Sequence, residues 1–324
     1  MSPVDINNPP LSIIFGISGY ELTRDEKDFF ADVNPLGFIL FARNAKDPAQ
    51  FSALTQSLKD CMGRDVPILI DQEGGRVARL KPPHWPAFPA AKTFGDANDA
   101  EGAYKNALAI ADMLAGAGVS VNCTPVLDIL FPETHPAIGD RAFSSDPALV
   151  ARLGLATIKG HLDRGVIPVV KHMPGQGRAD MDSHMDLPRV AASAQDIENI
   201  DLFPYREIMK SEFARAVWGM VSHVVYTSID PDNPATCSDA VMGGVIRRKL
   251  GFSGFLLSDD IVMNALSCVG DMGQRAATAV RAGCDAVLHC NGVMTEMRTV
   301  AEVAPRLGDE SIRRFNDSLA ALTV

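Results

Sequence analysis

The 324-residue sequence lacks the features that mark several classes of protein. It has no run of about 18 or more apolar residues, and its first residues show no basic stretch followed by an apolar segment of signal-peptide length. Acidic residues outnumber basic ones by 40 to 30, for a formal charge of −10, and the basic residues form no cluster. The sequence therefore predicts a soluble, cytoplasmic protein that binds neither nucleic acid nor membranes.

Cysteine is scarce, and its six positions are 61, 123, 237, 268, 284 and 290. No Cys-x-x-Cys pair occurs among them, which indicates reduced thiols rather than a disulfide framework. The His-x-His and His-Glu-x-x-His spacings of metal sites are absent too, and Lys171 beside His172 would oppose a cation. Because nucleotide-binding glycine motifs are also missing, we expect no metal and no cofactor.

The sequence does contain enough apolar side chains for a full core, since 47% of its residues are hydrophobic and 22% are charged. Short, continuous apolar runs recur along it. Such runs are typical of strands in a parallel sheet, with helices on one face and a packed core on the other. The eight runs are Leu11 to Ile17, Gly37 to Phe41, Pro67 to Ile70, Val119 to Cys123, Val166 to Val170, Ala216 to Val221, Gly254 to Leu257 and Asp285 to Leu288.

The segments between these runs carry the end signals of helices. The predicted N-cap residues are Asp47, Asp146, Ser238 and Asp309. Gly165 and Gly251 stand where a helix end requires a left-handed residue, and two further helices are expected after Cys290. Eight strand–helix units indicate one α/β domain over residues 1–324, a (β/α)8 barrel of the TIM type. Its connections vary in length near the N-terminus, which allows an irregular start.

In such a barrel the active site forms at the C-terminal ends of the strands, where distant parts of the sequence converge. Ionisable residues are frequent just past the apolar runs, which favours an enzyme over an interaction scaffold. They are Asp71, Glu73, Asp128, Lys171, His172, His223, Asp259, Asp260 and His289.

The stretch from Lys171 to His184 carries the most chemistry. Two cations at a strand end, Lys171 and His172, suit the hydroxyl or carboxylate groups of a substrate. A Pro-Gly-x-Gly segment then interrupts regular structure, so we expect Asp182 and His184 on a loop that can move. Their spacing lets the carboxylate orient the imidazole and raise its basicity, and the alternative is an ordinary surface turn.

Two further stretches supply carboxylates at strand ends. Strand alternation lets only one of Asp259 and Asp260 point into the barrel mouth. We expect Asp259 to be a nucleophile, base or metal ligand, and Asp260 to cap the helix that follows. In the loop from Asp71 to Arg79, Asp71 is the better ligand candidate, whereas internal salt bridging is expected for Glu73 and Arg76.

Four motifs, in this order and spacing, resemble family 3 glycoside hydrolases: IDQEGGRVARL, RAFSSDP, KHMPGQG followed by DSH, and LLSDDIVM. The similarity is to single-barrel β-N-acetylhexosaminidases of the NagZ type and extends from about Ile13 to Asn291, with DSH as its specific part. This branch usually has Phe and His where the sequence has Met173 and Gln176. The resemblance implies cytoplasmic removal of non-reducing N-acetylglucosamine from peptidoglycan fragments.

The resemblance also implies roles for individual residues. Asp259 would be the nucleophile, His184 the acid/base and Asp182 its partner. The residues expected to bind the substrate's hydroxyl and acetamido groups are Asp71, Arg79, Arg141, Lys171 and His172.

Enzymes of this kind usually retain anomeric configuration by means of two carboxylates. Here an imidazole that titrates near neutral pH would replace the second one. Two alternatives remain open at this point. Inorganic phosphate in place of water would make the protein a β-N-acetylglucosaminide phosphorylase, and a barrel without turnover would be a sugar-binding sensor.

Overall fold

Eight parallel strands close into a barrel in the computed structural model, which describes residues 1–181, 183 and 186–322. The order around the barrel is β1-β10-β9-β7-β5-β4-β3-β2, and every neighbouring pair is parallel. Each predicted apolar run overlaps one strand, so the predicted (β/α)8 barrel is confirmed. The barrel strands are β1 (Leu11–Gly16), β2 (Pro35–Leu40), β3 (Ile68–Ile70), β4 (Val121–Asn122), β5 (Ile167–Met173), β7 (Trp218–Val221), β9 (Leu256–Asp260) and β10 (Ala286–His289).

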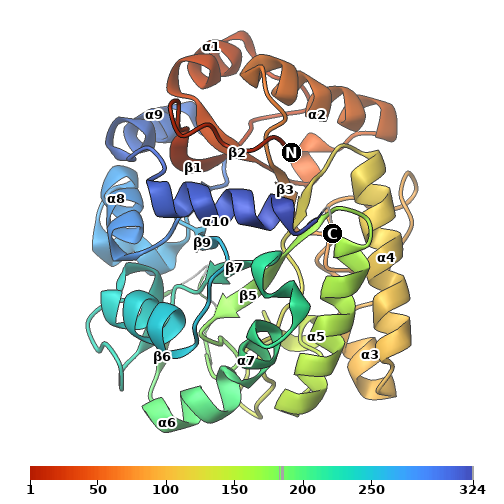
Figure 1. Cartoon of the computed structure of the whole chain (residues 1–324), viewed down its shortest axis with the longest axis vertical. Helices are drawn as coiled ribbons and strands as arrows, with labels where there is room; N and C mark the ends of the chain where they lie inside the picture. Colours follow the sequence, from red (N-terminus) through yellow and green to blue (C-terminus); the bar gives the residue numbers. More distant parts are fainter. Residues whose placement is uncertain (182, 184–185, 323–324) are drawn as a thin grey trace.

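Helices surround the barrel (Figure 1). The α-helices are α1 (Arg24–Val33), α2 (Pro48–Met62), α3 (Ala91–Ala97), α4 (Ala100–Gly116), α5 (Pro147–Leu162), α6 (Ala194–Asp196), α7 (Phe203–Met209), α8 (Met272–Ala282), α9 (Met294–Val303) and α10 (Asp309–Ala320). Shorter or wider helical turns are η1 (Ala42–Asn44), η2 (Gly139–Arg141), η3 (Ile197–Asp201), η4 (Glu212–Arg215), η5 (Ala235–Cys237), η6 (Ala240–Lys249) and η7 (Asn264–Val269). α1 and α2 join the first three strands by regular alternation, although the β1–β2 pairing shifts register between Leu11 and Ile14.

The predicted helix ends are mostly where the sequence places them. The Asp47 side chain accepts a hydrogen bond from the Gln50 N–H, and Asp146 caps α5 in the same manner. Gly165 and Gly251 have φ angles of +70° and +73°, in the left-handed region that favours glycine.

The two remaining predicted N-caps are Ser238 and Asp309. The Ser238 Oγ accepts from the Val241 N–H at 3.2 Å, at the start of η6. The prediction for Asp309 is wrong by one residue, because Gly308 occupies the N-cap position and Asp309 begins α10. In the first turn the Asp309 carboxylate still lies where the helix dipole favours negative charge.

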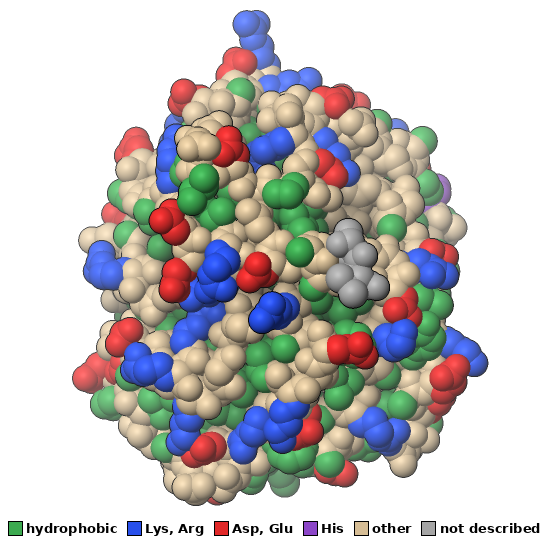
Figure 2. Space-filling view, in the orientation of Figure 1, with side chains coloured by type: hydrophobic (Ala, Val, Ile, Leu, Met, Phe, Trp, Pro, Cys, Tyr) green, Lys and Arg blue, Asp and Glu red, His purple; other side chains and the backbone are tan. Residues whose placement is uncertain are grey.

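α10 closes the N-terminal end of the barrel, and it lies across the near end of the strands in Figure 1. The ring of Phe315 on this helix lies 5.6 Å from Trp218 and 5.8 Å from Phe255, measured between centroids. The indole N–H of Trp218 donates to the Ser318 Oγ at 2.9 Å. On this face of the molecule, positive and negative side chains are interspersed (Figure 2). Substrate access is therefore left to the opposite end.

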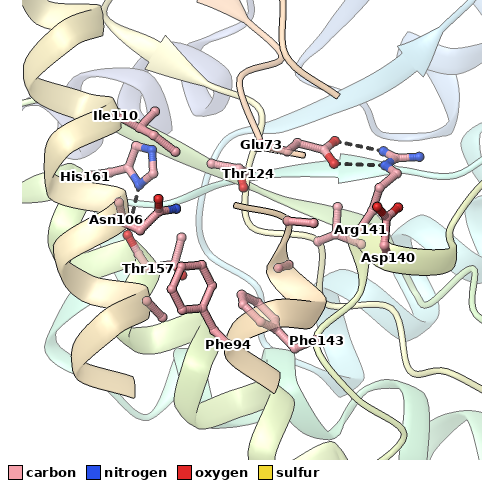
Figure 3. Close-up of a pocket in the computed structure, with 16 residues that line it drawn as sticks. Glu73, Phe94, Asn106, Ile110, Thr124, Asp140, Arg141, Phe143, Thr157 and His161 are labelled. Atoms are coloured by element: carbon pink, nitrogen blue, oxygen red, sulfur yellow. Dashed lines mark hydrogen bonds and ion pairs between the residues drawn. The ribbon is translucent and has the colours of Figure 1, made fainter. Parts of the chain in front are cut away.

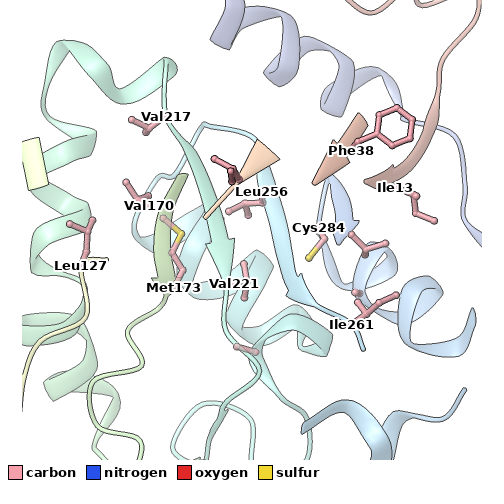
Figure 4. Close-up of a cluster of buried hydrophobic side chains, with 14 of the residues drawn as sticks. Ile13, Phe38, Leu127, Val170, Met173, Val217, Val221, Leu256, Ile261 and Cys284 are labelled. Atoms are coloured by element: carbon pink, nitrogen blue, oxygen red, sulfur yellow. The ribbon is translucent and has the colours of Figure 1, made fainter. Parts of the chain in front are cut away.

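Side chains alternate between two apolar layers along each strand. Ile13 and Leu256 belong to the layer between strands and helices, part of which Figure 4 shows. Ile14 and Leu257, one residue further along, fill the barrel interior. Near the C-terminal ends, a second small pair of strands, β6 (Arg189–Val190) and β8 (Val225–Tyr226), lies in the loops that follow β5 and β7.

Candidate active site

The C-terminal ends of the barrel strands surround a cavity of about 320 Å³. Four different strands or their following loops contribute its charged residues, as expected for this fold. The charged and polar residues that the argument below uses are Asp71, Arg79, Arg141, Lys171, His172 and Asp259. Every described residue among the predicted site residues therefore lines this one cavity. The predicted Asp182 and His184 lie outside the described residues.

Lys171, near the end of β5, is the centre of an ion-pair network. Its ammonium group lies 2.9 Å from the Asp71 Oδ1 and 2.7 Å from the Glu73 Oε1, and the side chain is only 2% exposed. Burial by itself would lower the pKa of Lys171, but the two carboxylates hold it above its usual value. Lys171 is therefore a fixed cation and a hydrogen-bond donor at the cavity wall.

Asp71 and Glu73 have different second partners. Arg79 Nη2 lies 3.0 Å from the other oxygen of Asp71, while Arg141 binds Glu73 through two hydrogen bonds of 2.9 Å. Burial would raise the pKa of both carboxyl groups, but these cations and Lys171 lower it, to about 2 for Glu73 and to well below the usual range for Asp71. Two anions and three cations thus form one network at the cavity wall, and all of them except Glu73 line the cavity itself.

Glu73 and Arg76 both form salt bridges, as expected, but with residues outside the Asp71–Arg79 loop and not with each other. Glu73 pairs with Arg141 and Lys171, as described above. Arg76 instead reaches Asp140, with 2.6 Å between Nε and Oδ1, and donates to the carbonyl groups of Pro136 and Ala137. Glu73 is the site residue whose importance was underestimated, and its position two residues after Asp71 was the available signal.

Asp259 and Asp260, at the end of β9, differ in environment. Asp259 faces the cavity, and its Oδ1 accepts from the Asp260 N–H at 2.8 Å. Burial would raise the pKa of Asp259, but nearby His172 and His223 lower it below its usual value. Asp259 is therefore an anion at neutral pH, as a carboxylate nucleophile must be.

Asp260 lines the cavity as well, contrary to the expectation that only one of the pair would, but its carboxylate binds the backbone of the adjacent loops. Its Oδ1 accepts from the Val262 and Cys290 N–H groups at 3.1 and 3.2 Å. Burial raises its pKa to about 6. Asp260 therefore caps a turn, as predicted in kind, but not a helix, because the next helical turn begins only at Asn264.

His172 is oriented by Asp128, which follows β4 and is fully buried. The distance from His172 Nδ1 to Asp128 Oδ2 is 2.7 Å, and the other ring nitrogen lies 3.5 Å from Arg141 Nη2. His223 also lies at a strand end, where its Nε2 is 3.0 Å from the Asp260 carbonyl oxygen. The Asp128–His172 contact was not anticipated, because 44 residues separate the partners.

The two residues that depart from the usual family pattern have separate environments. Met173 is buried in the layer between strands and helices. Gln176 lines the cavity and donates through Nε2 to the Ser183 Oγ at 3.2 Å. Ser183 lines the cavity as well, so this one described residue of the DSH triplet reaches the site.

A second cavity lies behind the Glu73–Arg141 pair, and Figure 3 shows both residues at its edge. Its volume is about 20 Å³, enough for a single water molecule. His161 on its wall hydrogen-bonds to Asn122 and to the Thr157 carbonyl, and burial lowers its pKa to about 4. Of these two cavities, only the one of about 320 Å³ has room for a sugar.

Residues 13–323 match the N-terminal domain of glycosyl hydrolase family 3. The chain belongs to this family. A β-hexosaminidase of Aromatoleum aromaticum is 34% identical over 309 residues, which are 94% of this chain and 85% of that protein. The chain is accordingly a glycoside hydrolase.

Solved structures show the same barrel. The NagZ protein of Neisseria gonorrhoeae, in complex with N-trifluoroacetyl-D-glucosamine, superposes with a TM-score of 0.87 at 30% identity, over 99% of this chain and 94% of that one. A family 3 β-N-acetylglucosaminidase of Paenibacillus has a TM-score of 0.88 at 33% identity over 96% of this chain, which spans 60% of the Paenibacillus chain.

The described residues offer neither a metal site nor a membrane-spanning helix. Within residues 1–181, 183 and 186–322, no group of three or more His, Cys, Asp or Glu side chains has an arrangement that could hold a metal ion. No helix of the described segments has both the length and the apolar character needed to cross a bilayer.

Proposed function

We propose that the protein is a retaining exo-β-N-acetylglucosaminidase that removes non-reducing N-acetylglucosamine from peptidoglycan fragments. The proposal includes the whole chain, residues 1–324, as a single catalytic barrel domain that acts in the cytoplasm. The observation that carries it is Asp259, an anionic carboxylate that faces a cavity walled by Lys171, Asp71 and the neighbouring arginines. The names of the two similar solved structures support the N-acetylglucosamine specificity.

The size of the cavity supports removal of one terminal sugar. Its volume of about 320 Å³ is near the lower limit of the roughly 300–1,000 Å³ usual for small-molecule sites. The opposite end of the barrel is closed by α10, so a polysaccharide cannot pass through. A single sugar ring inside, with its leaving group directed outward, is the arrangement that we propose.

In the proposed reaction the Asp259 carboxylate attacks C1 of the sugar and displaces the leaving group, which takes a proton from His184. Neutral His184 then removes a proton from water, and the resulting hydroxide attacks C1 and releases Asp259. Two inversions give retention. Asp182 would orient the imidazole and support its protonated form.

Lys171, Asp71, Arg79, Arg141 and His172 are proposed to bind the hydroxyl and acetamido groups. Charges held by ion pairs need no rearrangement as charge develops on the sugar, and such preorganised groups stabilise a transition state efficiently. The ion pairs hold the side chains in place before substrate arrives.

The test uses an aryl N-acetyl-β-glucosaminide and an N-acetylglucosaminyl muropeptide. We expect hydrolysis of both with β-configured N-acetylglucosamine as the first product by NMR, and peptide mapping after a 5-fluoro glycoside should place one label on Asp259. A label on Asp260, an α-configured first product, or no turnover would refute the proposal. Formation of a sugar 1-phosphate when phosphate is added would instead show a phosphorylase.

The matched pair for this test is Asp259→Asn and Asp260→Asn. We expect the first to lose at least about a thousandfold in turnover, because it removes the nucleophile. The second should keep most of its activity, since an amide oxygen can still accept from Val262 and Cys290. Equal losses in the two variants would contradict the assignment.

A further inference from the structure

Asp128 is a buried carboxylate that hydrogen-bonds to residues of the candidate site. It has no solvent exposure and does not line the cavity. Its hydrogen bonds with described residues go to the ring and backbone of His172 and to the backbone of Gln176. Both of these residues do line the cavity. Within the described part of the chain, Asp128 therefore acts on a bound sugar through these two residues.

We propose that Asp128 is a positioning residue that fixes the proton on Nδ1 of His172, so that the ring presents its Nε2 lone pair to a sugar hydroxyl. The inference rests on the proposed function, because it takes His172 to be a sugar-binding residue.

The argument starts from the chemistry of the short contact. An ionised carboxylate can only accept hydrogen bonds, so the 2.7 Å distance to Asp128 Oδ2 requires a proton on His172 Nδ1. In the neutral ring Nε2 is then an acceptor. Arg141 Nη2, a donor, lies 3.5 Å from this nitrogen, too far for a strong bond. The lone pair thus remains able to accept a hydrogen bond from a substrate hydroxyl.

The other oxygen of Asp128 holds the backbone on which the ring is mounted. Oδ1 accepts from the His172 N–H at 3.2 Å and from the Gln176 N–H at 2.7 Å. One carboxylate therefore sets the tautomer of His172, the position of its backbone, and the start of the segment that leads to Ser183. Three accepted hydrogen bonds also offset the cost of burying the negative charge.

The variant Asp128→Asn separates these roles. The amide oxygen can replace Oδ1 toward the two backbone N–H groups, and the amide NH2 would then face His172 Nδ1. Because an NH2 group donates, the ring would have to move its proton to Nε2 and would lose its acceptor in the cavity. We expect kcat/KM for an N-acetylglucosaminide to fall roughly 10- to 100-fold, the effect of losing a hydrogen bond in a charged network.

Two readouts distinguish positioning from a general structural role. Nitrogen-15 NMR of the ring, assigned by comparison with His172→Gln, should show a protonated Nδ1 and an unprotonated Nε2 in the unmodified protein, and the reverse in Asp128→Asn. In a double-mutant cycle, Asp128→Asn should cost less than about twofold when His172 is already Ala, because the effect passes through the ring.

The matched control is Asp285→Asn. Asp285 is another buried carboxylate with several partners, Arg247, Arg314 and Ser311, but it lies at the closed end of the barrel. We expect the Asp285→Asn substitution to lower the melting temperature and to leave kcat/KM of the folded enzyme unchanged.

The inference is overturned if Nδ1 carries no proton in the unmodified protein, if Asp128→Asn has unmodified kinetics, or if the losses of the two single variants multiply in the double variant. Absence of hydrolysis by the unmodified protein would instead refute the proposed function. In that case the NMR measurement alone still decides whether Asp128 sets the tautomer.

Discussion

The two ends of the barrel are built from the same strands but serve opposite purposes. At the N-terminal end, Trp218 and Phe255 pack against each other and against Phe315 of α10. At the C-terminal end, Lys171, Asp71 and Asp259 face the cavity. Along β5, the interior residues change from Ile167 and Val169 to Lys171 at intervals of two. The apolar layers thus supply stability, and we propose that the final charged layer supplies the chemistry.

The lesson is that inward direction alone does not distinguish core from site. β9 shows the same change, from Leu257 to Asp259, and β3 leads from Leu69 to Asp71. In each case the charged residue is the first inward position past the last apolar one. Substitutions at one end should therefore change stability, and substitutions at the other should change catalysis.

The largest separation should come from substituting His184, the proposed acid/base. If it is the general acid, His184→Ala should lose about 10²- to 10⁴-fold on a disaccharide, whose leaving alkoxide needs a proton. An aryl glycoside with an acidic phenol should form its glycosyl-enzyme much faster, because that anion leaves unaided. Added azide should then speed turnover and give a β-glycosyl azide. Equal losses on both substrates, with no azide product, would show that another residue is the acid.

At the closed end we expect a large effect on stability alone. Phe315→Ala removes a fully buried ring from the aromatic cluster and should lower the free energy of unfolding by about 3–5 kcal/mol. Denaturant unfolding measures this loss, with Phe315→Leu as the milder control. Activity at a temperature where the variant is folded should be unchanged. A specific loss of kcat/KM would contradict the separation of the two ends.

Lys171→Ala should affect the catalytic end and leave the closed end intact. Loss of a charged hydrogen bond to substrate should cost about 1.5–3 kcal/mol in transition-state binding. Asp71→Ala should cost a similar amount, because the two residues are paired. Steady-state kinetics on the aryl substrate measures both. If only the melting temperature fell, Lys171 and Asp71 would have a structural role, and the charged layer would contribute to stability as the apolar layers do.

The smallest effect concerns the pH dependence of stability at Asp260. Burial raises its folded-state pKa to about 6, above the ordinary 3.8, so folding favours the protonated form. The stability that it contributes is complete below about pH 4 and is lost as pH rises through about 6. Asp260→Asn avoids this loss. Between pH 4 and 7 the melting temperature of the variant should therefore gain roughly 2–4 °C on the unmodified protein. If the difference in melting temperature between the variant and the unmodified protein stayed constant over this pH range, burial would not destabilise the ionised form of Asp260.

Much of the barrel could be predicted from local sequence. The apolar runs coincide with the strands, and Asp47 and Asp146 cap helices where a following proline indicated it. Asp309 was misplaced by one residue because Gly308, which lacks a side chain to cap with, takes the N-cap position. Residues at the strand ends could be named in advance as well, because a parallel barrel gathers them at one end whatever their separation in sequence.

The sequence by itself determined the barrel, the end at which charge collects and the family motifs, because periodicity and short spacings are local properties. Only the tertiary structure decided the partners. Glu73 pairs with Arg141, 68 residues away, and not with Arg76 three positions along. Lys171 meets Asp71 across 100 residues, and Asp128 reaches His172 behind the cavity wall. The physical reason is that barrel closure, rather than distance along the chain, fixes which buried charges lie within hydrogen-bond reach of each other.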